Sequence, residues 1–92
     1  MARIKVIEFD GRFQQWQYWC EGCGDVHAFG PERHQFNGDL ENPTISPSLL
    51  ESYPGHVCHS FIKAGVIQYL DDCNHSLAGQ TIRLPDIDEK LK

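Results

Sequence analysis

Two cysteines three residues apart, Cys20 and Cys23, constrain the fold of this chain more than any other feature of its sequence. Gly24 follows them, which suits a tight turn whose thiolates converge on one ion. The chain has 92 residues, and domains of this size are often marginal without a metal, a disulfide or an oligomer contact. Inert thiols are one alternative, and a redox pair is another, although it would need a helix N-terminus beside a βαβ unit. The pair therefore predicts half of a tetrahedral zinc site.

The second half of the predicted site lies further along the chain, at Cys58 and Cys73. Residues 57–70 read as a β-hairpin that turns at residues 64–65, and this register places Cys58 opposite Asp71. Cys73 is then the diagonal neighbour of Cys58 on the same face, about 7–8 Å away. Two thiolates at that spacing can lean together onto one ion.

The sequence thus predicts one structural zinc ion per chain with an all-cysteine ligand set. Its members are Cys20, Cys23, Cys58 and Cys73. One position stays open to a histidine, because zinc also accepts three cysteines and one histidine. The alternates are His75, which keeps the strand parity of Cys73, and His59, which points away from Cys58 unless a bulge intervenes.

The rest of the chain reads as short strands separated by turn signals, which predicts a small, mainly β, zinc-stapled fold of the zinc-ribbon or knuckle type, with at most a short helical turn. Residues 4–9 and 12–19 form a predicted hairpin around Asp10-Gly11. Residues 43–48 hold two prolines and are predicted to be an extended, ordered loop. We expect a single domain over residues 1–84 and a charged, frayed tail over residues 85–92.

Composition excludes some classes of function. The chain carries 8 basic and 13 acidic residues, a net charge of −5, so broad nucleic-acid binding is disfavoured. No signal peptide and no apolar run of about 18 residues is visible, and cysteines that serve as metal ligands need a reducing compartment. We therefore expect a cytoplasmic location, without a membrane partner and with an undetermined oligomeric state.

The sequence offers no catalytic residue. Thr44, Ser46 and Ser48 lack an adjacent base in sequence and are expected to satisfy backbone groups of their loop. Asp71 and Asp72 are expected to cap a turn, although a catalytic zinc could use Asp72 beside a bound water. The chain is therefore more readily interpreted as a non-enzyme.

Five ordered segments form a specific series of motifs. They are residues 19–27 (WCEGCGDVH), 36–39 (FNGD), 43–50 (PTISPSLL), 58–62 (CHSFI) and 72–81 (DCNHSLAGQT). The series resembles a family of short proteins of unknown function from tailed bacteriophages and prophages, some of which carry the label "ammonia monooxygenase". The resemblance implies a phage or prophage origin and a bacterial host cytoplasm, and no established reaction.

Three functions are compatible with these features. The first is a zinc-stapled interaction module that binds a bacterial or phage protein, and it is favoured because an all-cysteine site leaves no position for an activated water. The second is a zinc-dependent hydrolase or nuclease. The third is a nucleic-acid-binding zinc ribbon, which the acidic charge disfavours.

Overall fold

The computed structural model describes residues 2–92 and contains two antiparallel sheets. The first sheet has three strands, which are β1 (Lys5–Phe9), β2 (Arg12–Cys20) and β3 (Asp25–Phe29). The second has five, which are β4 (Gln35–Phe36), β5 (Ile45–Tyr53), β6 (His56–Lys63), β7 (Val66–Tyr69) and β8 (Thr81–Arg83). One short helix follows, α1 (Ile87–Lys90). The predicted mainly β fold is confirmed.

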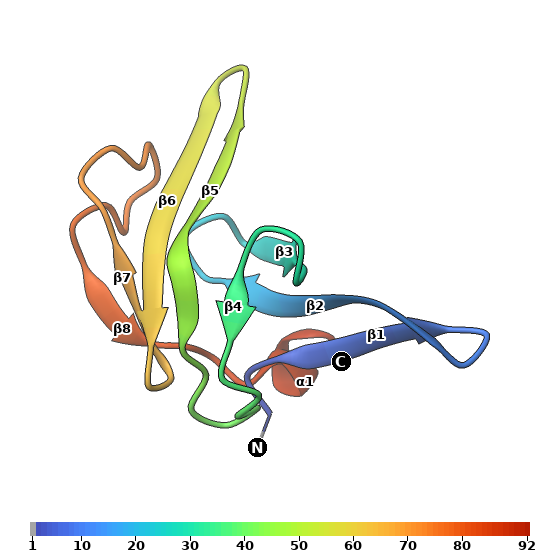
Figure 1. Cartoon of the computed structure of the whole chain (residues 1–92). Coiled ribbons are helices and arrows are strands. Elements are labelled where there is room, and N and C mark those ends of the chain that lie inside the picture. Colours follow the sequence, from blue (N-terminus) through green and yellow to red (C-terminus); the bar gives the residue numbers. More distant parts are fainter. Residues whose placement is uncertain (1) are drawn as a thin grey trace.

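The first sheet begins with the predicted hairpin. β1 and β2 turn at Asp10 and Gly11, whose φ angles of 53° and 75° suit Asp-Gly. The tip of this hairpin extends away from the rest of the molecule (Figure 1). β2 then ends at Cys20 and β3 begins at Asp25, so the cysteine pair occupies the β2–β3 turn.

The second sheet contains the other predicted hairpin. β6 and β7 turn at Ala64 and Gly65, with Lys63 paired with Val66, which confirms the register used to place Cys58. β5 and β6 form a longer hairpin whose closed end rises above the body of the molecule (Figure 1).

Residues 43–48 are not only a loop, because β5 begins within them at Ile45. The pairing of β5 with β6 shifts register between Ile45 and Leu49. Proline has no N–H to donate to a ladder, and bulges are among the few places where a sheet accommodates it. The irregular stretch therefore lets Pro47 lie inside a strand, and it also carries Ser48.

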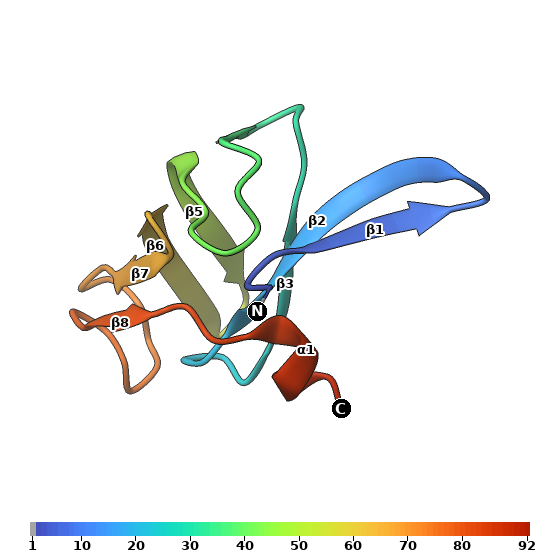
Figure 2. The same cartoon turned by 90° about the horizontal axis from the view of Figure 1, so that it is seen from below.

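The hydrophobic core lies where the two sheets face each other (Figure 2). Its fully buried side chains come from both sheets and include Tyr18, Ile62, Ile67 and Tyr69. Cys20 and Cys58 belong to the same cluster of buried residues, and the partly buried Cys23 packs against it.

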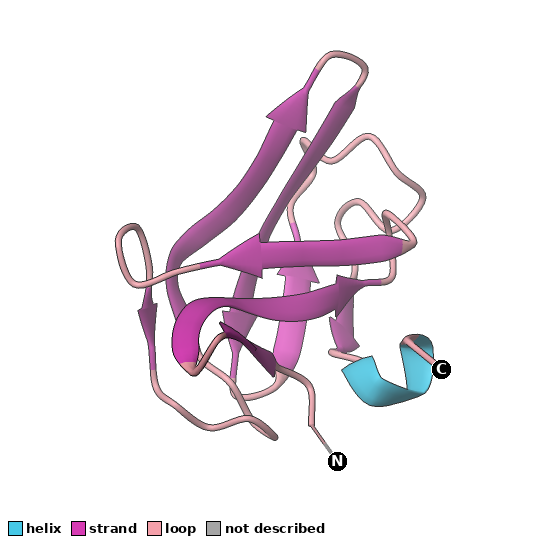
Figure 3. Cartoon of the chain, turned by 90° about the vertical axis from the view of Figure 1, so that its right-hand side faces the viewer, coloured by secondary structure: helices cyan, strands magenta, loops and turns pink. Residues whose placement is uncertain are grey.

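The C-terminal residues 85–92 differ from the expected frayed tail by carrying α1, which lies beside the sheets (Figure 3). The Asp86 carboxylate caps the helix by accepting hydrogen bonds from the backbone N–H groups of Asp88 and Glu89. Ile87 is fully buried, and its N–H donates to the carbonyl of Ala2 at 3.0 Å. The buried Ile87 side chain, its backbone hydrogen bond and the 3.0 Å ion pair of Lys90 with Glu21 thus hold the segment against the body.

No helix within residues 2–92 has the length and apolar character needed to cross a membrane.

Candidate functional site

The β2–β3 turn brings the first two thiols together. Cys20 is fully buried at the end of β2, and its Sγ accepts a hydrogen bond from the N–H of Cys23 at 3.4 Å. The N–H of Gly24 closes the turn on the carbonyl of Cys20 at 2.8 Å, and Gly24 has a φ of 66°, which glycine adopts without strain. Both side chains therefore face the second sheet from one tight turn.

The second sheet supplies the third thiol. Cys58 on β6 is buried, and its Sγ lies 3.6 Å from the Sγ of Cys20. All four cysteines of the chain are free thiols. The site thus joins the two sheets at residues 38 positions apart in the sequence.

Histidines approach these thiols from several sides, and one of them is His56, whose Nε2 lies 3.2 Å from Sγ of Cys23. The ligand atoms of Cys20, Cys23, His27 and Cys58 all lie within 4.8 Å of one another. His27 is buried, and its Nδ1 has no hydrogen-bond partner. Nε2 of His75 lies 3.4 Å from Sγ of Cys58.

His75 also lies directly against the turn that carries the cysteine pair. A Cβ atom at Gly22 would fall 2.2 Å from Cε1 of His75, so only glycine leaves room for the ring. The ring packs edge-on against Tyr69, whose hydroxyl lies 3.4 Å from Sγ of Cys20 and accepts the N–H of Gly22 at 3.3 Å. The imidazole is therefore fixed at the edge of the thiol cluster.

The thiols cannot all ionise by themselves. The hydrogen bond from Cys58 lowers the pKa of Cys20 to about 3, while that same contact raises the pKa of Cys58 far above its usual value. Burial, reinforced by the contact with Cys20, raises the pKa of Cys23 to about 12. One thiolate charge is stable here, and further charges repel it. A divalent cation would remove that repulsion.

The donor set fits a soft or borderline metal ion. Several buried thiols with imidazole nitrogens in one cluster are the ligands that Zn²⁺ takes in closed tetrahedral sites. Nδ1 of His27 is a buried polar atom without a hydrogen bond, and the nearest charge to it is Oε1 of Glu51 at 3.6 Å. The predicted metal-binding cluster is therefore supported, while the identity of the metal stays a prediction.

Cys73, the fourth predicted ligand, makes different contacts. Its Sγ accepts the N–H of His59 at 3.2 Å and its S–H donates to the carbonyl of His59, also at 3.2 Å. Its thiol does approach Cys58 and His75, with which it forms a second cluster of possible ligands. Cys73 thus holds the backbone of β6 at His59.

The side chain of His59 points away from the cysteines, to the other face of β6. Its Nε2 lies 2.9 Å from Oγ of Ser48, and its Nδ1 lies 3.0 Å from Oδ2 of Asp72. Both ring nitrogens are thus engaged outside the two thiol clusters. The histidine thus links a serine hydroxyl to an aspartate carboxylate. This is the hydrogen-bonding order of a serine–histidine–aspartate triad, the arrangement used in nucleophilic catalysis.

The register of the sheet explains this triad. His59 on β6 is paired with Leu50 on β5, and Ser48 lies two residues before Leu50 in the irregular stretch of that strand. Beyond β7, the N–H of Leu70 donates to the carbonyl of His59 at 2.9 Å, which places Asp72 diagonally beside His59. Three segments of one sheet therefore converge at one spot.

The loop that carries Asp72 is tied to β6 by Asn74. Its side chain accepts the N–H of Val57 at 2.9 Å and donates to the carbonyl of Gly55 at 2.9 Å. With the contacts of Cys73, and that of the Leu70 N–H with the carbonyl of His59, the chain is hydrogen-bonded to β6 both before and after Asp72. The carboxylate is 56% exposed but stands on a fixed backbone.

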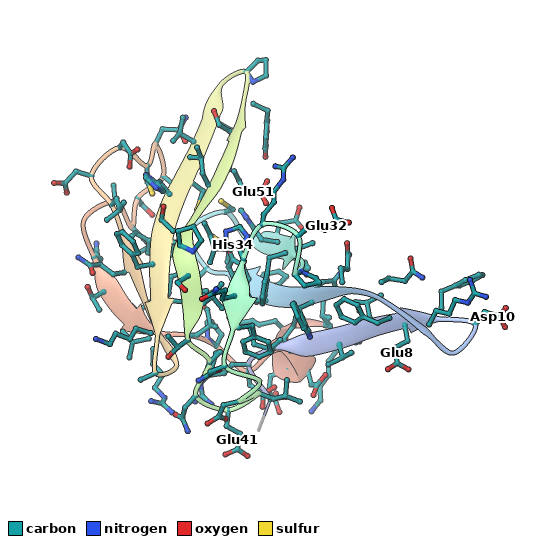
Figure 4. The ribbon with its side chains drawn as sticks, viewed as in Figure 1. Glu8, Asp10, Glu32, His34, Glu41 and Glu51 are labelled. Carbon is teal, nitrogen blue, oxygen red and sulfur yellow. The ribbon has the colours of Figure 1, made fainter. Side chains whose placement is uncertain are left out.

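His34 contacts the backbone of Ser48. Its Nε2 lies 3.1 Å from the carbonyl oxygen of Ser48, a contact in which the ring N–H donates. Figure 4 shows the His34 side chain beside β5. His34 therefore positions Ser48 and does not touch its hydroxyl in this arrangement.

Sequence analysis missed the triad, although its own register argument contained part of it. The register that makes Cys73 the diagonal neighbour of Cys58 also makes Asp72 the diagonal neighbour of His59. Ser48 carries no comparable signal, because its approach to His59 depends on the pairing of β5 with β6 and on the bulge at Pro47.

Comparisons with known proteins gave one match. The model of a family described as "Bacterial ubiquitination-like system serine protease (BubE)" matches residues 2–70 of the 92. That range includes Ser48 and His59 and ends just before Asp72. Searches of the curated proteins and of the solved structures gave no match.

Proposed function

The chain belongs to the family of bacterial ubiquitination-like system serine proteases (BubE), and we propose that it is a serine hydrolase whose nucleophile is Ser48. The observation that carries the proposal is the contact of His59 with Ser48 on one ring nitrogen and with Asp72 on the other. The sequence of the chain alone favoured an interaction module, because it did not reveal this convergence.

Each member of the triad has a defined task. Nε2 of His59 accepts the hydroxyl proton as Oγ of Ser48 bonds to the carbonyl carbon of the substrate. His59 then gives that proton to the leaving amine or alcohol as its bond to the carbonyl carbon breaks, which leaves an acyl ester on Ser48. Water hydrolyses this ester by the same proton transfers, releasing a carboxylic acid. Asp72 accepts the Nδ1–H of His59 and thereby holds the tautomer that the reaction needs.

The metal site is proposed to be structural. Cys20, Cys23 and Cys58 would supply three thiolates to one zinc ion, and His27 or His75 would be the fourth ligand. Such a site has no open position, so its role is to fasten the β2–β3 turn to β6. The zinc-dependent hydrolase predicted as an alternative needed Asp72 near the metal, whereas its carboxylate contacts His59.

The proposed substrate is a protein. The family's description names a protease of a bacterial ubiquitination-like system, and a protein substrate would be the protein partner that the sequence analysis predicted. A bacterial cytoplasm agrees with free thiols and a metal site. The phage or prophage origin stays a prediction, since the matching family is not described as a phage family.

A fluorophosphonate probe tests the proposal, because such probes phosphonylate serines that an adjacent base activates. Metal-loaded protein should be labelled at Ser48, as mapped by tandem mass spectrometry. The variant H59A should lose the label while keeping its circular dichroism spectrum. An unlabelled but folded wild type, or equal labelling of H59A, would refute the serine hydrolase.

The variant D72N should lower the turnover number by about 10²- to 10³-fold with little change in KM. Asparagine cannot stabilise the imidazolium that forms on His59. The loss should be smaller than the roughly 10⁴-fold known for a buried triad carboxylate, because Asp72 is 56% exposed and solvent screens its charge. Hydrolysis of p-nitrophenyl butyrate measures it, with D71N as the matched control. Equal effects of the two variants would remove Asp72 from the triad.

A further inference from the structure

We propose that the groove on the outer face of the second sheet, beside Ser48, binds an apolar side chain of the protein substrate, next to the carbonyl that Ser48 attacks. This inference deepens the proposed function and rests on it. It assigns a specificity-determining role to Phe61, which stands on β6 two residues beyond His59.

The groove is mainly apolar and is large enough to hold an apolar side chain of a substrate. It encloses about 560 Å³ between the start of β5, the end of β6 and the strands β7 and β8. Its walls include Ile45, Phe61, Ala64 and Val66, and Lys63 is the one ionisable residue among those lining it. Phe61 is 45% exposed, so its ring is accessible to a substrate in the groove.

The charged grooves of the molecule lie elsewhere. One is lined by Glu32, Arg33, His34 and Glu51 and lies between β5 and β3. Figure 4 shows Glu32 and Glu51 on that side of β5, toward β3. The face beside Phe61 is therefore distinct in its chemistry, and a charged substrate group would find no counter-ion there except Lys63.

The groove lies on the acyl side of the triad. Along β5 and β6 the paired residues run from Leu50 and His59 toward Ile45 and Ile62, with Ser48 in between. The groove therefore lies beyond Ser48 on the side away from His59. Its lining residue nearest to Ser48 in the sequence is Ser46. Because His59 protonates the leaving group, the leaving group lies on the His59 side of Ser48. The acyl part of the substrate then extends past Ser48 into the groove.

Phe61 connects the groove with the base. Its ring centroid lies 6.5 Å from that of His59, and the two side chains stand on the same face of β6. An apolar chain that packs on Phe61 is therefore held within reach of Ser48 and excludes water from the reacting carbonyl. Binding energy of this kind increases kcat when it holds the carbonyl carbon in the position for attack.

A series of p-nitrophenyl esters tests the subsite, because only the acyl chain changes. We expect kcat/KM for the hexanoate to exceed that for the acetate by about 10- to 100-fold. The variant F61A should reduce this ratio at least fivefold, and L50A should keep it, because Leu50 is an exposed apolar residue of β5 that does not line the groove. Circular dichroism and fluorophosphonate labelling check that both variants fold and retain an activated serine.

The outcomes separate this inference from the proposed function. Absence of both ester hydrolysis and fluorophosphonate labelling refutes the serine hydrolase, and the subsite with it. Hydrolysis at equal rates for all chain lengths keeps the hydrolase and refutes the apolar subsite. A strong preference for the hexanoate that F61A and L50A leave equally unchanged places the subsite elsewhere, which also overturns the inference.

Discussion

Replacement of Ser48 by alanine should lower hydrolysis of p-nitrophenyl butyrate by about 10⁴- to 10⁶-fold. The hydroxyl that His59 activates at 2.9 Å is then missing, and no covalent intermediate can form. Ser48 is only partly buried, so the loss of one oxygen atom should leave the fold intact. Enzyme kinetics on metal-loaded protein, with metal content and circular dichroism recorded in parallel, measure the effect.

The matched control lies on the same strand. Ser52 is an exposed serine of β5, and S52A removes an identical group without touching His59. S52A should retain wild-type activity within about twofold. If S48A keeps more than a tenth of the wild-type rate, the hydroxyl is not the nucleophile and the contact with His59 is only structural.

Local sequence signals were sufficient to predict much of the fold. Asp10-Gly11 and Ala64-Gly65 specify their hairpins because two-residue turns need residues that accept positive φ, and all four positions have it. The cysteine pair predicted the β2–β3 turn for a similar reason, because Gly24, which follows it, also accepts a positive φ. Each of these signals consists of residues adjacent in the chain, so it can be recognised from a single sequence.

The features that were missed depend on long-range pairing. Ser48 meets His59 only because β5 pairs with β6 and because the ladder shifts register around Pro47. The prolines of residues 43–48 were interpreted as marking an extended loop, whereas a register shift in the ladder keeps Pro47 within a strand. In the C-terminal segment, the apolar Ile87 between charged residues was the signal for a packed turn.

Removal of the metal should have the second large effect. Closed zinc sites contribute on the order of 10 kcal/mol in small domains, which is comparable to the whole free energy of unfolding of a typical domain. We therefore expect a strong chelator, or C20S, to unfold the chain at 25 °C. The measurements are metal content by mass spectrometry and the fluorescence of Trp19, which precedes Cys20 in β2. A metal-free protein with unchanged fluorescence and circular dichroism would show that the site is not structural.

Cysteine variants separate the metal site from the catalytic one. C58S should lose metal and fluorophosphonate labelling together, because Cys58 directly precedes His59 on β6 and belongs to the thiol cluster. C73A should keep one equivalent of metal but label more slowly, since it loses only the two contacts with the backbone of His59. If C73A instead loses its metal, the predicted all-cysteine ligand set is correct. The contacts of Cys73 with His59 would then be secondary to its binding of the ion.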